Sequence, residues 1–74
     1  MSQPIRLHDV VALLTDVPER GLKRGQVGTI VESLAPNVYE VEFSDDEGRA
    51  YATLALKDDQ LIVLQYQAAA IAGE

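Results

Sequence analysis

The sequence predicts one small all-β domain, and three observations support this prediction. The chain has 74 residues, which is enough for a single domain. Its apolar residues fall in short runs separated by glycine, proline, asparagine and aspartate, as in a series of strands and turns. Over residues 38–44, glutamates alternate with apolar residues, which is the period of a strand with one buried face.

The first two strands are predicted at 9–15 and 26–34, with Ile5–Leu7 also extended. The run Val10–Leu14 is apolar on both faces. A helix is the alternative for this run, but two adjacent valines and the nearby Pro18 argue against it. Residues 16–25 form the longest loop, and residues 35–37 form a turn in which asparagine tolerates a left-handed conformation.

The next hairpin joins a strand at 38–44 to a strand at 49–54 through the loop 45–48. If Ser44 lies opposite Arg49, three pairs face the core, namely Phe43 with Ala50, Val41 with Ala52 and Tyr39 with Leu54. The same register points Glu40, Glu42 and Tyr51 outward, with Tyr51 opposite Glu42.

A tight turn over 56–61, expected to be 3₁₀, precedes a last strand at 61–64. This strand is apolar on both faces, so a cover is expected for Ile62 and Leu64. Two covers are considered: the tail 65–74, or a second copy of the chain in a weak homodimer. Residues 1–64 are therefore assigned to the domain, and the tail is expected to be helical, to extend the last strand, or to fray.

Five short strands, a long first loop and a 3₁₀ turn before the last strand resemble a small SH3-like barrel. The segment Gly21–Glu32 is similar to the glycine-containing half of a KOW motif. Taken together, the chain resembles the DUF4926 family of small bacterial proteins from Leu7 to about Leu64. The matching segments are Asp9-Val10-Val11 with Leu14, Gly25–Glu32, Tyr39–Phe43 and Asp59-Gln60-Leu61. The family is of unknown function, so the resemblance implies a fold and no activity.

Composition argues against an enzyme and against a cofactor or metal site. There is no cysteine and one histidine, His8, whose neighbour Asp9 points to the opposite face of a strand. The run Asp45–Gly48 lacks the alternating ligands of a calcium loop, so we interpret it as a solvated hairpin tip. No apolar stretch is long enough for a membrane helix, and no targeting segment is visible, so a soluble cytoplasmic protein is expected.

Net charge narrows the class of partner. The chain carries twelve acidic and six basic residues, a net charge of −6, and the excess lies within residues 38–74. Such a charge opposes general binding to a phosphate backbone, which makes nucleic acid an unlikely partner. It is compatible with a basic protein partner.

Six residues are candidates for contact with a protein partner, and three glycines are assigned structural roles. The candidates are Arg20, Lys23 and Arg24 on the long loop, and Glu40, Glu42 and Tyr51 on the hairpin. Gly25 is expected to end the loop with an unusual φ, Gly28 to allow close approach of another strand, and Gly48 to take a positive φ.

These residues predict a non-catalytic protein-binding adaptor or accessory domain. Two alternatives stay open. One is an acidic antitoxin or immunity partner that neutralises a basic toxin. The other is a KOW-like RNA or ribosome contact through Arg20, Lys23 and Arg24.

Overall fold

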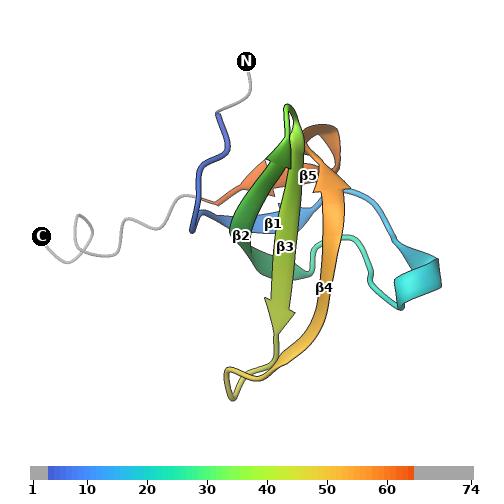
Figure 1. Ribbon diagram of the computed structural model, residues 1–74. Helices are drawn as coiled ribbons and strands as arrows, with labels where there is room; N and C mark the ends of the chain where they lie inside the picture. The colour runs from blue at the N-terminus through green and yellow to red at the C-terminus, as the bar shows by residue number, and fades with distance from the viewer. Residues whose placement is uncertain (1–3, 65–74) are drawn as a thin grey trace, which may run out of the picture.

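The computed structural model describes residues 4–64, and within them it contains five strands and two short 3₁₀ helices (Figure 1). The elements are, in chain order, β1 (Val10–Leu13), η1 (Pro18–Arg20), β2 (Val27–Ala35), β3 (Val38–Ser44), β4 (Ala50–Lys57), η2 (Asp58–Gln60) and β5 (Leu61–Val63). The predicted all-β class, the five strands and the 3₁₀ turn before the last strand are confirmed. The predictions for the tail 65–74 fall outside the described residues.

The strands form one antiparallel sheet in the order β4-β3-β2-β1-β5. Within residues 4–64 the two edge strands, β4 and β5, do not pair with each other. The sheet is therefore open, whereas the sequence predicted a barrel. The physical reason lies in the connection between them. The chain passes from β4 to β5 through η2 rather than through a hairpin turn, and all three residues of β5 pair with β1.

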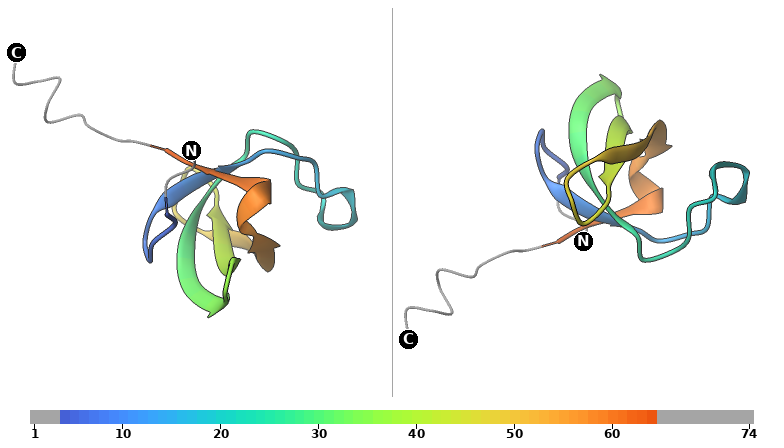
Figure 2. Two further views of the ribbon diagram at one scale, coloured as in Figure 1. Left: turned by 90° about the horizontal axis from the view of Figure 1, so that it is seen from above. Right: turned by 90° about the horizontal axis from the view of Figure 1, so that it is seen from below.

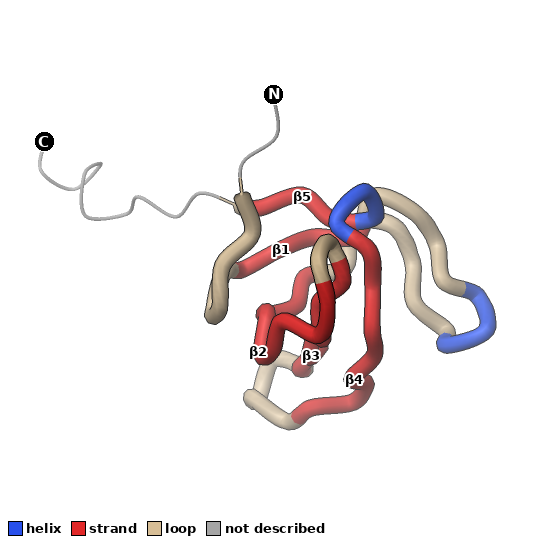
Figure 3. The backbone as a smooth tube through the Cα atoms, turned by 45° about the horizontal axis from the view of Figure 1, so that its top comes forward, coloured by secondary structure: helices blue, strands red, loops and turns tan. Residues whose placement is uncertain are grey.

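The long strand β2 bends the sheet into two halves. It pairs with β1 near its start and with β3 along its length, and the β2–β3 ladder is irregular between Ile30 and Glu32 and between Ser33 and Ala35. Such bulges increase the local twist and bend of a strand. As a result, β1 and β5 cross the direction of β3 and β4, as the views in Figures 1 and 3 show.

The core lies between these two halves. Its buried residues are Val11, Leu13, Val17, Leu22, Ile30, Val41, Phe43, Leu56 and Leu61, and within residues 4–64 no charged side chain is buried with them. Gly28 belongs to the same packing, because a Cβ added there would meet Val41 Cγ1 at 2.8 Å and Phe43 Cδ1 at 2.9 Å. The sheet can close over Phe43 only because this position of β2 has no side chain.

The predicted register of the β3–β4 hairpin is wrong by two residues, although its two faces are right. Val41 lies opposite Leu54 and Phe43 opposite Ala52, whereas Ala52 and Ala50 were the predicted partners. Two shifts of one residue add up to this error: Ser44 lies opposite Ala50 rather than Arg49, and an irregularity between Phe43 and Ser44 leaves Tyr51 as an extra residue on β4. A shift of two residues keeps each side chain on its own face, so the apolar residues still point inward.

A turn replaces the predicted extended segment at Ile5–Leu7. Residues 6–9 form a turn in which Asp9 N–H donates to the Arg6 carbonyl at 3.1 Å, and His8 has a φ of 71°. The strand β1 is therefore shorter than predicted. In η2, the Gln60 side-chain oxygen accepts the Lys57 N–H at 2.9 Å. Among the described residues, no helix is long and apolar enough to cross a membrane.

Candidate protein-binding surfaces

The loop between β1 and β2 is a small hairpin held by its own apolar residues. Figure 2 shows it reaching away from the sheet. Val17 and Leu22 pair as an antiparallel bridge, and both are buried. The Gly25 N–H donates to the Leu13 carbonyl at 2.8 Å with φ at 93°, so the loop returns to the sheet at the expected glycine. Its three basic residues, Arg20, Lys23 and Arg24, are all exposed.

Two side chains connect this loop to the edge strand β4. Arg20 Nη2 donates to the Thr53 carbonyl at 3.3 Å, and Gln26 Nε2 donates to the Tyr51 hydroxyl at 2.9 Å. The oxygen of the same Gln26 side chain accepts the Lys23 N–H at 2.5 Å. The structure therefore joins two predicted contact regions, the basic loop and Tyr51, which lie more than 25 residues apart in the sequence.

Tyr51 does not lie opposite Glu42 as the predicted register implied. Its ring packs near the ring of Phe43, with 6.5 Å between centroids and a 37° angle between planes, and half of the residue stays exposed. Because Tyr51 is the extra residue of the bulge, Glu42 lies opposite Thr53 instead. Tyr51 is thus part of the loop contact and separate from the glutamates with which it was grouped.

The glutamates of β2 and β3 form what we call the acidic patch, made of Glu32, Glu40 and Glu42. Glu32 lies directly opposite Glu40 on the neighbouring strand, and Glu42 follows Glu40 by two residues and so points to the same face. Glu32 is exposed, while Glu40 and Glu42 are half-buried. Like charges directly opposite one another in a sheet are destabilising.

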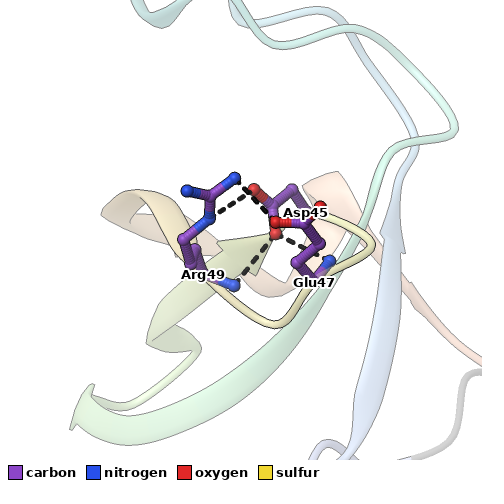
Figure 4. A network of polar contacts seen from close by, with 3 residues as sticks. All are labelled: Asp45, Glu47 and Arg49. Carbon is purple, nitrogen blue, oxygen red and sulfur yellow. Dashed lines mark hydrogen bonds and ion pairs between the residues drawn. The ribbon is translucent and has the colours of Figure 1, made fainter.

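The acidic residues at the tip of the β3–β4 hairpin are arranged differently (Figure 4). Arg49 contacts two of them, with Nε 3.4 Å from Asp45 Oδ2 and Nη2 2.9 Å from Glu47 Oε1. Asp45 Oδ1 also accepts the N–H groups of Glu47 and Arg49, each at 2.9 Å. Within residues 4–64 these are the only ion pairs, so no basic side chain of that part of the chain pairs with the acidic patch.

A third surface, which we call the apolar row, consists of Val27, Ala12 and Ile62 on β2, β1 and β5. Ala12 lies opposite Val27 on one side and opposite Ile62 on the other, so the three side chains point to one face. Val27 is 45% exposed and Ile62 is 49% exposed. Leu64, whose N–H donates to the Val10 carbonyl at 2.8 Å, extends the same apolar surface.

Sequence reasoning missed Glu32, Gln26 and Val27 as surface candidates. The alternation of Glu40 and Glu42 was readable, but the position of Glu32 opposite Glu40 depends on the bulge after Ile30, for which the sequence carries no signal. The role of Gln26 depends on the register at Tyr51. Within residues 4–64 no three His, Cys, Asp or Glu side chains come together closely enough to hold a metal ion.

Comparison with known proteins gives one family. A family model described as Domain of unknown function (DUF4926) matches residues 7–63, which is more than half of the chain. Neither the curated proteins nor the solved structures contain a match to this chain.

Proposed function

The chain belongs to the DUF4926 family, and we propose that it is a small non-catalytic protein-binding domain whose partner presents a basic surface to the acidic patch. The observation that carries this proposal is the direct opposition of Glu32 and Glu40 on neighbouring strands. Such a pair lowers the stability of the free domain. A lysine or arginine of a partner placed between the two carboxylates would turn this repulsion into attraction, so the same pair favours the complex.

The contrast with the hairpin tip supports a role in binding. Asp45 and Glu47 both pair with Arg49 within their own hairpin, whereas the acidic patch has no such partner in the described part of the chain. The net charge of −6 adds a long-range attraction for a basic protein. A surface whose charges are left unpaired is suited to a partner that supplies the opposite charge.

The loop and Tyr51 provide a second contact region of the proposed domain. Tyrosine is enriched among the residues that contribute most to protein interfaces, and Tyr51 is half exposed beside Gln26. Lys23 and Arg24 lie on the same loop and are exposed, so acidic residues of the partner can reach them.

The strand order and the position of η2 support an SH3-like topology, and the absence of cysteine supports a reducing compartment such as the cytoplasm.

The acidic patch also bears on the two alternative functions. A basic toxin belongs to the partner class that we propose, so a small basic protein encoded beside this gene is the first partner to test. The RNA alternative has less support, because Arg20, one of its three basic residues, donates to the domain's own β4.

The experiment is a quantitative pull-down with the tagged full chain from the source organism, comparing two double variants. Glu32→Gln with Glu40→Gln removes two charges from the acidic patch. Asp58→Asn with Asp59→Asn removes the same number from η2, which is not part of the patch, and serves as the matched control. We expect a basic protein to be retained by the wild type and the control and reduced at least tenfold with the patch variant. Retention should also weaken between 50 and 300 mM NaCl. The Debye length is about 10 Å at 0.1 M salt and shortens as the salt concentration rises, so the attraction between the patch and a basic surface is screened.

The proposal is overturned if the patch variant retains the same basic proteins as the control. It is also overturned if RNA, rather than protein, is retained at low salt and is lost in the variant Lys23→Glu with Arg24→Glu. A tenfold loss that is equal in both double variants would show that only the net charge matters and would remove the acidic patch as a site.

A further inference from the structure

The strand β4 lies at one edge of the sheet, and the backbone of its outer side faces away from the other strands (Figure 1). Among residues 4–64, β3 is the one strand that pairs with β4. The Thr53 carbonyl accepts a hydrogen bond from the Arg20 side chain, so it points away from β3. In an antiparallel ladder the N–H and C=O of one residue point to the same side, and the direction alternates along the strand. Ala55, two residues after Thr53, therefore presents both of its backbone groups to the edge.

Hydrogen bonds at the end of β4 agree with this alternation. The Asp58 N–H donates to the Asn37 carbonyl at 2.9 Å, on the β3 side, as expected for a residue an odd number of positions from Ala55. Lys57, which shares the direction of Ala55, donates its N–H to the Gln60 side chain. Within residues 4–64, no side chain and no loop backbone forms a hydrogen bond with the backbone of Ala55. An unpaired edge of this kind is a template for another strand.

Small side chains separate this edge from the acidic patch. Ala55 lies directly opposite Glu40 and Thr53 directly opposite Glu42, so each small residue stands between one carboxylate and the edge. Neighbouring strands lie about 4.8 Å apart, so a strand added to β4 would lie about 10 Å from β3. A lysine or arginine opposite Ala55 can extend its apolar stem over the alanine methyl group and bring its charge to the Glu40 carboxylate. One face of the edge therefore fits basic side chains.

The other face of the edge fits apolar side chains. Ala52 and Leu54 point to the inner face of the sheet and are partly buried against the core. Successive side chains of an added strand would alternate between the two faces, so the edge fits a segment in which basic and apolar residues alternate. This chain offers no such segment at its C-terminus, because residues 65–74 contain no lysine or arginine. The β4 strand of a second copy carries a single basic residue, Lys57.

We propose that β4 binds an extended segment of another protein by strand addition, and that the basic residues of this segment, alternating with apolar ones, reach Glu40 and Glu42. The inference rests on the proposed function, since it names the form in which a basic partner meets the acidic patch. Arg20 must leave the Thr53 carbonyl before the added strand can donate to it. That hydrogen bond is exposed and 3.3 Å long, so its loss opposes binding only weakly. In this mode main-chain hydrogen bonds supply affinity, and alternate side chains supply specificity.

Titration of the full chain with a synthetic peptide, in which lysine alternates with valine, tests the proposal. Two N-methylated forms of the peptide are compared, one methylated on the backbone nitrogen of each lysine and the other on that of each valine. An added strand turns the N–H groups of alternate residues towards β4. One form should therefore lose affinity at least tenfold while the other retains it. Loss in the lysine form supports antiparallel addition, and loss in the valine form supports parallel addition.

Amide hydrogen exchange locates the added strand on the protein. We expect the Ala55 amide to exchange rapidly in the free chain, because it faces the edge, and to slow at least tenfold when the unmodified peptide saturates the domain. The Asp46 amide, at the tip of the β3–β4 hairpin, is the control and should not change.

A pair of charge variants tests the contact with the carboxylates. Glu40→Gln with Glu42→Gln should bind the unmodified peptide at least tenfold more weakly, because both carboxylates beside the edge lose their charge. Asp58→Asn with Asp59→Asn removes the same charge from η2 and is the matched control, for which a smaller loss is expected.

Equal affinity of the two methylated forms, or an Ala55 amide that the peptide leaves unchanged, would overturn strand addition. If the variant of Glu40 and Glu42 still loses the peptide in that case, the proposed function stands and this inference alone falls. If that variant binds like its control, both fall. Slow exchange of Ala55 in the free chain also overturns the inference: it gives the edge to a second copy if it depends on protein concentration, and to the C-terminal segment if it does not.

Discussion

The inner and outer faces of the sheet differ in how completely their residues are matched to their surroundings. On the inner face, Val11, Ile30, Val41 and Phe43 are fully buried, and Gly28 leaves the space that Phe43 fills. On the outer face of the same strands, Glu32 lies opposite Glu40, and the apolar row is almost half exposed. The inner face therefore determines the fold, and the outer face keeps features that reduce the stability of an isolated domain. Features of that kind are expected where a partner binds.

The largest expected effect is on the inner face. Replacing Phe43 by Ala should lower the free energy of unfolding by about 3–5 kcal/mol, because it removes a fully buried ring and leaves a cavity. Tyr51→Ala is the control, since its ring contacts Phe43 but is half exposed, and it should cost about 1 kcal/mol. Urea denaturation measures both. If Phe43→Ala leaves no folded protein, Phe43→Leu, with a smaller loss, replaces it. Equal losses for Phe43 and Tyr51 would contradict the division between the faces.

The next effect tests the close approach at Gly28. Gly28→Ala should cost about 1–3 kcal/mol, because the added Cβ would lie 2.9 Å from the Glu42 carbonyl oxygen, which belongs to the backbone and cannot rotate away. Gly25→Ala is the control, where the space is open but φ is 93°, so a strain of about 1–2 kcal/mol is expected without crowding. Methyl NMR separates the two causes, since only Gly28→Ala should shift the signals of Val41. Unchanged Val41 methyl signals in Gly28→Ala would show that the approach is looser than described.

Most of the inner face was predictable from the sequence, because burial on one side of a strand imposes a period of two. The alternation Tyr39, Val41, Phe43 identified β3 with its observed bounds, and Asn37 takes the left-handed φ of 67° expected of its turn. A register error of two residues in the hairpin did not move these residues from the core, since it preserves the faces. The glycine at position 28 could likewise be recognised as a site of close approach.

The outer face was less predictable because its pairing depends on bulges. Two irregularities in β2 and one in the hairpin decide that Glu32 faces Glu40 and that Tyr51 meets Gln26. No composition rule places an extra residue in a strand, so these neighbours could not be read from the sequence. The open sheet has a similar origin, since closure depends on how η2 joins two edge strands. The apolar row was half predicted: Ile62 was expected to need a cover, but its alignment with Val27 required the structure.

A smaller effect, of opposite sign to those of the inner face, is expected at the acidic patch. Glu40→Gln should raise the free energy of unfolding by about 0.2–1 kcal/mol, because it removes the repulsion from Glu32. The same chemical change at Glu47 should lower it slightly, since Glu47 pairs with Arg49 at 2.9 Å. Thermal unfolding at 20 mM salt compares the two variants, and both differences should shrink at 500 mM NaCl. A lower free energy of unfolding in Glu40→Gln would mean that the carboxylate of Glu40 stabilises the domain and that its repulsion from Glu32 is not the dominant effect.

The smallest effect is expected where the loop meets β4, which belongs to neither face. Arg20→Ala removes an exposed hydrogen bond of 3.3 Å to the Thr53 carbonyl and should lower the free energy of unfolding by about 0.5 kcal/mol or less. The control is Arg24→Ala, whose side chain makes no such bond among the described residues, and its free energy of unfolding should not change measurably. Stability alone will hardly separate these variants, so amide hydrogen exchange of β4 is the better measurement. An antiparallel edge strand presents the N–H and C=O of one residue on the same side. Since the Thr53 carbonyl faces the loop, its N–H should face it too, and exchange at Thr53 should accelerate in Arg20→Ala and not in Arg24→Ala. Equal exchange in both variants would show that Arg20 does not protect the β4 amide groups from exchange. The hydrogen bond between Gln26 and Tyr51 would then be the contact that holds the basic loop in place.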